Sequence, residues 1–330
     1  MKDQYIIYGG ELSYFTRKLE AACIFYGLPF DMRNKNLSEP EIIEARSGTH
    51  QIPVLHTPEN WMIGDTTPIM RLLDERYPAR RMFPDGPTGL IVQVLEEFFD
   101  EWVARTMVHY RWHYPESAAF ASMKMAEGNA EIAERVRNWG PRACRATGTD
   151  SEVQRQAAED EYRRIIEAAE NQLSKTRYLL GDRPTAVDCV VLGGLRAHTL
   201  MDPDPKRIYS EYSQVLSFSE NSRDVWDGGG NIDFGQPTDF AEFVAREIVP
   251  TYQPFIIANK ASQEAGAKAF HACIYGEEVS YLSRPYPEQS RRMIADRLAG
   301  LKDPEREWAT QWLLERDITV FSVILLFPPH

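Results

Sequence analysis

The stretch YGGELSYFTRK, residues 8–18, carries the pattern from which the fold of this chain is best predicted. The apolar residues up to Tyr8 are typical of a buried strand, and the two glycines after it allow a sharp turn. Apolar residues then recur at helical spacing from Tyr14 to Tyr26, and Gly27 is typical of the end of such a helix. Ser13 directly precedes the helix, where a hydroxyl caps free backbone N–H groups. The stretch therefore predicts a strand, a turn and a capped helix.

The residues up to position 80 continue this alternation. We expect a strand over 28–32, a short helix from a Ser38 cap to Ala45, a hairpin of strands 52–55 and 61–63, and a helix over 66–77. This order predicts a small mixed α/β sheet with helices on both faces. We assign it to a first domain, residues 1–80.

Helical patterns dominate the remaining residues, which we assign to a second, all-α domain over 88–330 with inserted or added elements. Helices are expected over 90–114, 151–174, 186–199, 240–267 and 288–316, and a long surface loop over 202–239. The helix over 186–199 is nearly all apolar, so it should be buried. Thr185 and Asp188 have the spacing of a capping box at its start.

Composition and charge exclude several classes of function. The net charge of −12 argues against a nucleic-acid partner, because phosphate binding needs clustered Lys and Arg. The four dispersed cysteines indicate reduced thiols, and the start of the chain lacks the apolar run of a signal peptide, so we expect a cytoplasmic location. The apolar tail, Ile318 to Phe327, would span roughly 15 Å as a helix and cannot cross a membrane. It is interpreted as a buried segment or a partner- or membrane-surface segment.

Four motifs together resemble glutathione transferases of the serine type. Residues 8–18, followed by GLPF at 27–30, are similar to the family's strand, serine and helix opening. QIPVL at 51–55 resembles its cis-proline segment, and Asp65-Thr66 resembles its acidic-hydroxyl pair. Residues 178–188 are similar to the stretch that caps the buried helix. The resemblance implies a thioredoxin-like N-terminal domain that binds glutathione and an all-α C-terminal domain, whereas residues 202–330 match only as helical sequence.

Ser13 falls on the position of the family's catalytic serine, so the resemblance implies that its hydroxyl stabilises the glutathione thiolate. The other reading of Ser13 is a simple helix cap. Tyr8 is the alternative candidate for stabilising the thiolate, because tyrosine-type members of the superfamily place a phenol near the end of the same strand. Cys23 lies within the predicted helix and is interpreted as core packing.

The remaining glutathione-binding residues are also implied by the resemblance. Pro53 would present the backbone of Ile52 to the cysteinyl part of glutathione. Asp65 and Thr66 would bind the γ-glutamyl ammonium and carboxylate at a helix start. Turn geometry and capping are the alternative roles of these residues. Four cations could meet the glycine carboxylate, with none singled out: Arg17, Lys18, Arg33 and Lys35.

The pocket for the second substrate is expected along the helix over 90–114, with Arg105, His109 and Tyr110 as candidates. His109 and His113 have an i, i+4 spacing that suits a metal, but a third ligand is missing, so we expect no metal.

The sequence therefore predicts a glutathione-dependent transferase that conjugates the thiolate to a small hydrophobic electrophile, with glutathione as cosubstrate. The alternatives are a noncatalytic ligand-binding protein with the same fold and a glutathione-dependent isomerase or lyase. The resemblance also implies a homodimer.

Overall fold

The computed structural model describes residues 4–222 and 226–321, and packing divides the chain into two units. Unit 1 comprises Met1–Phe83 and Leu173–Ile232, and unit 2 comprises Pro84–Gln172 and Asp233–His330. Each unit thus combines two segments that are distant in sequence. The expected domains, 1–80 and 88–330, follow chain order rather than packing, and this division of the chain stays a prediction.

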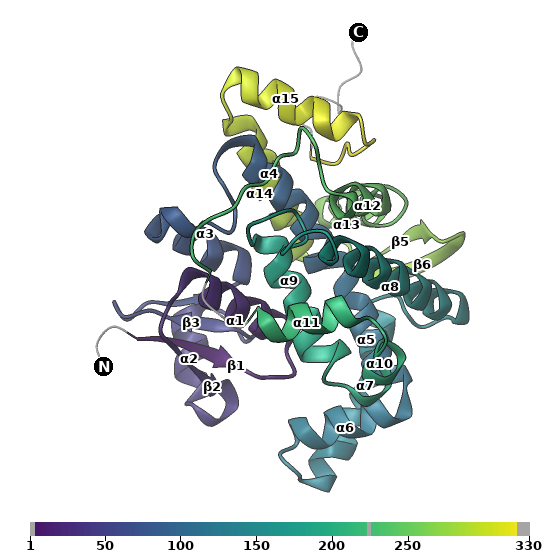
Figure 1. Ribbon diagram of the computed structural model, residues 1–330. Coiled ribbons are helices and arrows are strands. Elements are labelled where there is room, and N and C mark those ends of the chain that lie inside the picture. Colours follow the sequence, from purple (N-terminus) through teal and green to yellow (C-terminus); the bar gives the residue numbers. More distant parts are fainter. Residues whose placement is uncertain (1–3, 223–225, 322–330) are drawn as a thin grey trace. The chain divides into compact units, whose positions relative to one another are not determined.

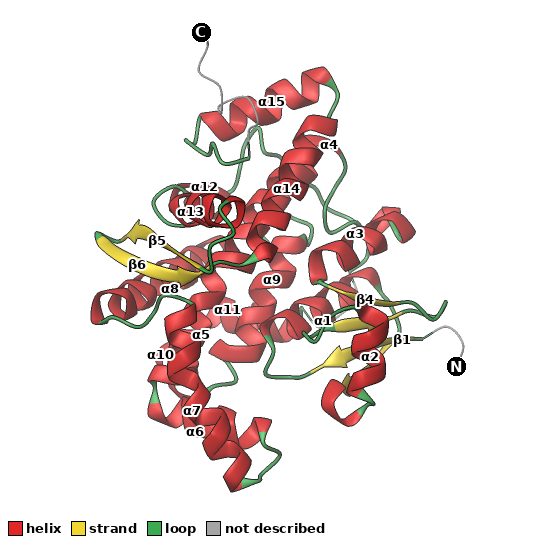
Figure 2. Ribbon diagram, turned by 180° about the vertical axis from the view of Figure 1, so that it is seen from behind, coloured by secondary structure: helices red, strands yellow, loops and turns green. Residues whose placement is uncertain are grey.

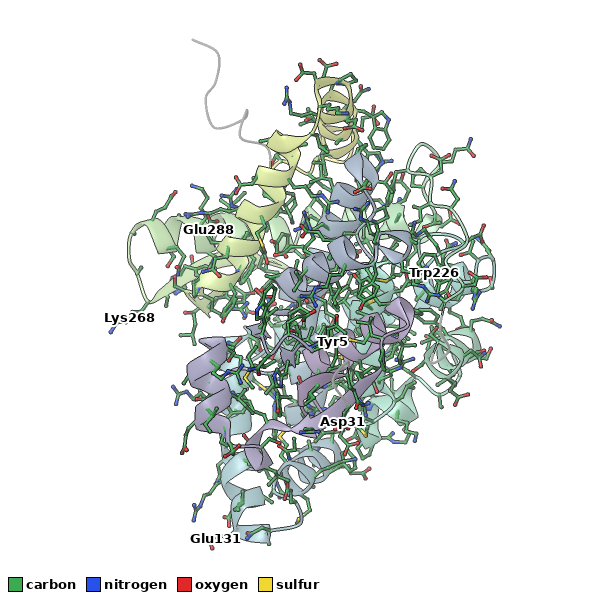
Figure 3. All side chains as sticks on the ribbon, turned by 90° about the vertical axis from the view of Figure 1, so that its left-hand side faces the viewer. Tyr5, Asp31, Glu131, Trp226, Lys268 and Glu288 are labelled. Carbon is green, nitrogen blue, oxygen red and sulfur yellow. The ribbon has the colours of Figure 1, made fainter. Side chains whose placement is uncertain are left out.

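The sheet of unit 1 has four strands in the order β2-β1-β3-β4. β1 (Tyr5–Gly9) pairs in parallel with β2 (Phe30–Asn34), and Tyr5 and Asp31 mark this pair in Figure 3. β3 (Val54–His56) runs antiparallel to β1 and to β4 (Met62–Gly64). The hairpin and the mixed sheet are as the sequence predicts.

Three helices flank this sheet (Figure 1): α1 (Tyr14–Tyr26), α2 (Pro40–Ser47) and α3 (Thr66–Arg76). Tyr8 and Val54 form a buried cluster with Ile43 of α2 on one face. α1 and α3 contact each other on the other face. Side chains alternate along a strand, so successive residues of β1 serve different faces.

Two details of this region correct the sequence analysis. A 3₁₀ turn, η1 (Lys35–Leu37), follows β2, and the Ser38 hydroxyl donates to the Asn34 carbonyl at 2.8 Å instead of capping α2. The residue that precedes α2 is Glu39, with a φ of 55° and no capping side chain. A second 3₁₀ turn, η2 (Pro78–Arg80), follows α3.

The buried helix expected over 186–199 is confirmed as α9 (Ala186–Gly194), which continues into the π-helical η4 (Leu195–Thr199). Its capping box is present: Asp188 accepts hydrogen bonds from the backbone N–H groups of Leu179 at 2.9 Å and Thr185 at 2.8 Å. α9 packs against α1, which explains why residues 173–232 belong to the unit that contains the sheet.

The loop expected over 202–239 is wrong in its first half, which forms α10 (Pro203–Ile208) and α11 (Ser213–Asn221). Proline at N1 starts α10, and Val215 and Phe218 bury one side of α11. Further along, the indole of Trp226, labelled in Figure 3, donates to the Gly229 carbonyl at 2.8 Å and lies under the Arg183 guanidinium. Asp, Ser and Pro favour helix starts as well as loops, which explains the error.

Unit 2 begins with a continuous helical run, as expected over 90–114. It comprises α4 (Gly86–Glu97), the π-helical η3 (Phe98–Val103) and α5 (Ala104–His113). Two helices that the sequence analysis did not anticipate follow, α6 (Pro115–Met125) and α7 (Ala130–Ala146), and then the expected α8 (Glu152–Leu173). Pro141 lies inside α7, and proline is a residue type that usually ends or kinks a helix.

The last part of unit 2 corrects the expectation of an all-α domain. β5 (Ala269–Ile274) and β6 (Glu277–Leu282) form an antiparallel hairpin, visible in Figure 2 as a separate group of strands. Both turn residues have positive φ, 53° at Tyr275 and 77° at Gly276, as a two-residue hairpin turn requires. The second part of the chain is therefore largely helical.

Each of the two long helices expected in this part is divided into two consecutive helices. The first is α12 (Asp239–Ile248) and α13 (Tyr252–Glu264), and the second is α14 (Pro285–Gly300) and α15 (Asp303–Leu314). Of the apolar tail Ile318 to Phe327, Ile318 and Phe321 are buried, and residues 322–327 lie outside the described residues.

Candidate functional site

One edge of the sheet in unit 1 gathers the residues that the sequence analysis singled out. Tyr8 is paired with Val54, and Val54 with Gly64, so the register continues to Gly9, Pro53 and Asp65 side by side. A side-chain atom built on Gly10 would lie 3.9 Å from Ile52 Cδ1, which agrees with this register. The edge therefore brings together the start of α1, the residues before β3 and the start of α3.

Ser13 is the N-cap of α1. Its backbone is extended, with φ −96° and ψ 121°, and its Oγ accepts a hydrogen bond from Thr16 N at 3.2 Å. The half-buried hydroxyl keeps its own hydrogen available for a further acceptor. The positive end of the helix dipole lies at the same point. Capping and the stabilisation of an anion are thus compatible roles for this side chain.

The Ile52–Pro53 peptide bond is cis, as the resemblance implied. Pro53 itself is buried, whereas Ile52 is partly exposed. The ammonium of Lys35 donates to the carbonyl oxygens of His50 at 2.6 Å and Gln51 at 3.3 Å. Lys35 thus holds the backbone that leads into Ile52, so its role is to position this segment.

Asp65 and Thr66 begin α3. Asp65 has a φ of 67°, and its Oδ1 accepts a hydrogen bond from Thr67 N at 3.3 Å, which makes it the N-cap. Thr66 is only 4 % exposed. The first N–H groups of α3 face the same edge as those of α1, so two helix N-termini favour an anionic ligand there.

Small residues fix the start of α1 against its neighbours. A Cβ on Gly9 would lie 2.4 Å from Thr16 Oγ1, and Gly10 N donates to that oxygen at 3.3 Å. A Cβ on Gly193 would lie 2.7 Å from the Tyr14 carbonyl, and one on Gly194 would lie 2.9 Å from the Tyr14 ring. The glycine pair of α9, which the sequence analysis did not single out, thus sets the position of the residue after Ser13. A Gly-Gly dipeptide in an otherwise apolar helix is the signal that could have found it.

The four candidate cations are all engaged within unit 1. Arg17 pairs with Glu20 at 2.8 Å, and Arg33 with Asp31 at 2.8 Å. Lys18 is fully buried, 3.5 Å from Thr67 Oγ1. Lys35 pairs with Glu44 at 2.9 Å. Each of them therefore has partners in the protein, and the two helix N-termini add partial positive charge at the sheet edge.

Tyr8 points to the other side of the sheet from α1. Its ring stacks with that of His56, with 6.2 Å between centroids, and packs with Ile43 of α2. α1, which carries Ser13 at its start, covers the opposite face. The pleat of β1 therefore favours Ser13 over Tyr8 as the hydroxyl at the sheet edge.

Cys23 is fully buried in α1, and burial raises the pKa of its thiol far above the usual value. The interpretation of Cys23 as core packing is confirmed. All four cysteines are free thiols: Cys23, Cys144, Cys189 and Cys273.

The three residues expected to line an electrophile pocket are interior residues of unit 2. Arg105 is 4 % exposed and pairs with the buried Glu161 at 2.8 Å. His109 Nε2 lies 2.9 Å from Glu159 Oε1, and burial lowers the pKa of His109 to about 4. Tyr110 is 1 % exposed. Burial within unit 2 accounts for all three side chains, so their role toward a substrate stays a prediction.

The two histidines spaced for a metal bind protein groups instead. His113 Nε2 contacts the Thr149 carbonyl at 2.8 Å, and burial lowers the pKa of His113. Within residues 4–222 and 226–321, no group of three or more His, Cys, Asp or Glu side chains could hold a metal ion. In the same part of the chain, no helix combines the length and apolar character needed to span a membrane.

Two sequence families match the chain. Residues 7–81 match the glutathione S-transferase N-terminal domain, and residues 152–193 match the glutathione S-transferase C-terminal domain. The two matches follow the order of the family's domains and include the sheet edge, α8 and most of α9. The chain belongs to the glutathione transferase superfamily. No curated protein matches it in sequence.

Several solved structures are similar to this superfamily member at low identity. A glutathione S-transferase from Rhodospirillum rubrum F11 is 18 % identical over 65 % of this chain and 86 % of its own, with a TM-score of 0.45. One from Methylobacillus flagellatus KT with glutathione bound is 16 % identical over 67 % of this chain and 100 % of its own, with a TM-score of 0.42. FzlA from C. crescentus is 14 % identical over 66 % and 87 %, with a TM-score of 0.45.

Proposed function

We propose that the chain is a glutathione-dependent transferase in which Ser13 stabilises the thiolate of glutathione. The proposal depends on one observation: the strand register brings Ser13, Ile52-Pro53 and Asp65-Thr66 to one edge of the sheet, where two helices begin. Ser13 and Asp65 are the caps of those helices.

The chemistry that the site must supply is the loss of a proton from the thiol. An unperturbed thiol has a pKa of about 8.5 and is only a few per cent ionised at neutral pH. A hydrogen bond from the Ser13 hydroxyl and the partial charge of the α1 N-terminus both favour the anion. Lowering the pKa by about two units takes roughly 2.7 kcal/mol, which a charged hydrogen bond and a helix terminus can supply together.

The rest of glutathione is bound by backbone and by α3 in this proposal. Ile52 offers its backbone N–H and C=O to the cysteinyl residue in the manner of an added strand. The first N–H groups of α3 bind the γ-glutamyl carboxylate, and Asp65 pairs with the ammonium. The candidate cations are paired with protein groups, so in this proposal the N-termini of α1 and α3 attract the anionic ligand to a chain whose net charge is −12.

The reaction we propose is nucleophilic displacement on a small hydrophobic electrophile. The sulfur forms a thioether bond to the electrophilic carbon, and the leaving group departs with the electron pair. The free cysteines fit a reducing, cytoplasmic location. We also propose that the protein forms a homodimer.

The test separates binding from catalysis. Wild-type protein should bind glutathione in a calorimetric titration, show the ultraviolet absorbance of a thiolate in the complex, and conjugate glutathione to a dinitrophenyl chloride. Ser13→Ala should still bind but lose the thiolate absorbance at neutral pH. Binding without a thiolate in the wild type would replace the transferase proposal by a ligand-binding protein, and absence of glutathione binding would overturn both.

A matched variant separates the two roles of the hydroxyl. Ser13→Asp keeps an oxygen acceptor for Thr16 N but has no proton to donate to sulfur at neutral pH. Its helix should stay capped while the thiol pKa rises above that in the wild type. Ser38→Ala, at a serine that caps no α-helix, serves as the control and should change neither quantity.

A further inference from the structure

Unit 2 contains a cavity of about 590 Å³ that is separate from the residues of the sheet edge. It is formed by the end of α7, the turn between α7 and α8, the first residues of α8, and β6. This volume lies in the range of small-molecule sites, which is roughly 300–1,000 Å³. All of its lining residues belong to unit 2.

Two nearly fully buried side chains that line this cavity each have a polar atom without a hydrogen-bond partner among the described residues. Gln154 is 0 % exposed, and its Nε2 donates to the Ile274 carbonyl at 2.8 Å, which fixes the amide and leaves Oε1 unpaired. Tyr281 is 3 % exposed, and its hydroxyl is unpaired. Buried polar groups without partners are rare in folded proteins, so this pair points to a ligand.

The phenol of Tyr281 is held firmly in place. Its ring packs against Phe255 and Phe270, with centroids 5.2 Å and 5.5 Å away. A Cβ on Gly148 would lie 2.3 Å from the ring, so only glycine fits beside it. Burial raises the pKa of Tyr281 to about 12, which keeps the hydroxyl protonated and able to donate at neutral pH.

The cavity lining also carries charges of both signs from different elements. Arg142 and Arg145 come from α7, and neither guanidinium is paired with a carboxylate in the part of the chain that the structure describes. The carboxylates are Asp150, from the turn before α8, and Glu277 and Glu278 of β6. Glu277 accepts the Ser151 hydroxyl at 2.6 Å, whereas Glu278 is exposed.

We propose that this cavity binds a short zwitterionic peptide with an apolar side chain. Its carboxylate meets Arg142 and Arg145, and its ammonium meets Glu277, which lies on the same face of β6 as Tyr281. A peptide N–H donates to Gln154 Oε1, and the Tyr281 hydroxyl donates to a peptide carbonyl.

The distribution of charge favours a zwitterion over a simple ion. A ligand with only negative charge would meet Glu277 and Glu278 as well as the long-range field of an acidic chain. A ligand with only positive charge could pair with the three carboxylates of the lining but would leave the guanidinium groups of Arg142 and Arg145 without an anionic partner. The apolar side chain of Val279, on the same face of β6 as Tyr281, matches an apolar group on the ligand.

The test uses the dipeptide Phe-Ala and two forms of it that each lack one charge. Calorimetric titration of the full chain should show Phe-Ala binding. N-acetyl-Phe-Ala, without the ammonium, and Phe-Ala amide, without the carboxylate, should each bind at least about tenfold more weakly. Equal binding of all three forms, or no binding of Phe-Ala at millimolar concentration, would overturn the proposal.

Variants locate the binding site. Arg145→Gln and Tyr281→Phe should each raise the dissociation constant of Phe-Ala about tenfold. Arg137→Gln, on an exposed part of α7 outside the cavity, is the matched control and should leave it unchanged. Thermal unfolding of each variant shows whether the fold is kept.

The sheet edge must be excluded as the site, because glutathione is itself a peptide. Lys35→Met, which releases the carbonyls before Ile52 and should weaken glutathione binding, should leave the affinity for Phe-Ala unchanged, and Arg145→Gln should leave the affinity for glutathione unchanged. If excess glutathione displaces Phe-Ala and Lys35→Met also weakens Phe-Ala binding, the dipeptide lies at the sheet edge and the proposal is wrong. Because these readouts do not use the transferase activity, this proposal and the proposed function can fail separately.

Discussion

Glu161 is the residue of unit 2 whose loss should cost the most stability. Its carboxylate is fully buried on α8, and Oε2 accepts hydrogen bonds from Trp102 Nε1 at 3.0 Å, Arg105 Nη2 at 2.8 Å and the Tyr275 hydroxyl. Glu161→Ala removes the acceptor for all three donors at once. It also leaves the Arg105 guanidinium, 4 % exposed, without its carboxylate.

The magnitude follows from these contacts. Removing one partner of a buried ion pair costs about 3–5 kcal/mol. Two further donors lose their acceptor, at about 1–3 kcal/mol for each that stays buried, but neighbouring effects do not add fully. We therefore expect Glu161→Ala to lower the free energy of unfolding of unit 2 by about 5 kcal/mol, a large part of the roughly 5–15 kcal/mol of a typical domain.

Glu131→Ala is the matched control. Glu131 also pairs with an arginine, Arg135, but both side chains are at least 73 % exposed, and such pairs contribute about 0–1 kcal/mol. Urea unfolding gives the overall loss for each variant. Hydrogen exchange followed by mass spectrometry then assigns the loss: protection should fall in α8 and the β5–β6 hairpin and stay unchanged in the sheet of unit 1.

Two results show whether the buried ion pair of Glu161 contributes to stability. If Glu161→Ala loses no more stability than Glu131→Ala, the buried pair contributes nothing and our account of this cluster is wrong. Arg105→Met combined with Glu161→Leu should regain part of the loss, because the double variant leaves no buried charge unpaired.

Three further predictions concern unit 1. Burial raises the pKa of Asp188 from 3.8 to about 6, so folding favours its neutral form. The stability that the neutral form contributes is complete below about pH 4 and is lost as the pH rises through about 6. In urea titrations the free energy of unfolding should therefore fall by up to about 3 kcal/mol over this range, and Asp188→Asn should show no such fall. A free energy of unfolding that rises with pH would contradict this account. Gly194→Val should lower the urea midpoint by the equivalent of about 1–3 kcal/mol, because a side chain there meets the Tyr14 ring; an unchanged midpoint would mean that α9 and α1 can move apart freely. Lys35→Met should raise the calorimetric dissociation constant for glutathione about tenfold by releasing the carbonyls before Ile52, and wild-type affinity would show that this segment holds its position unaided.

Local signals predicted much of unit 1. The start of α1 at Tyr14 and the capping box at Thr185 depend on hydrogen bonds within a few residues, so the sequence patterns were sufficient. The sheet edge could be assembled from the same information, since a hairpin and one strand define it. Local pattern identified Ser13 only as a helix cap, whereas the family resemblance implied its position in the site and the cis-proline at Pro53; the chemical roles of both residues stay proposals.

Features that depend on distant partners could not be predicted. His109 has the spacing of a metal ligand, but its burial beside Glu159 is visible only once α5 and α8 are packed together. The side of the sheet that Tyr8 faces depends on where α2 lies. The β5–β6 hairpin is a different case, because the alternation of its two six-residue strands and its Tyr275-Gly276 turn were readable in the sequence and were missed.

The discontinuous make-up of unit 1 has a consequence for biosynthesis. The ribosome releases residues 1–83 first, then the whole of Pro84–Gln172, and only afterwards the helix α9 that packs on α1. The nascent sheet must therefore persist with α1 exposed while Pro84–Gln172 is synthesised. Chaperones can bind the exposed surface of α1 during this interval. A fragment that stops at residue 83 should consequently aggregate, and adding residues 173–232 as a separate peptide should restore its solubility.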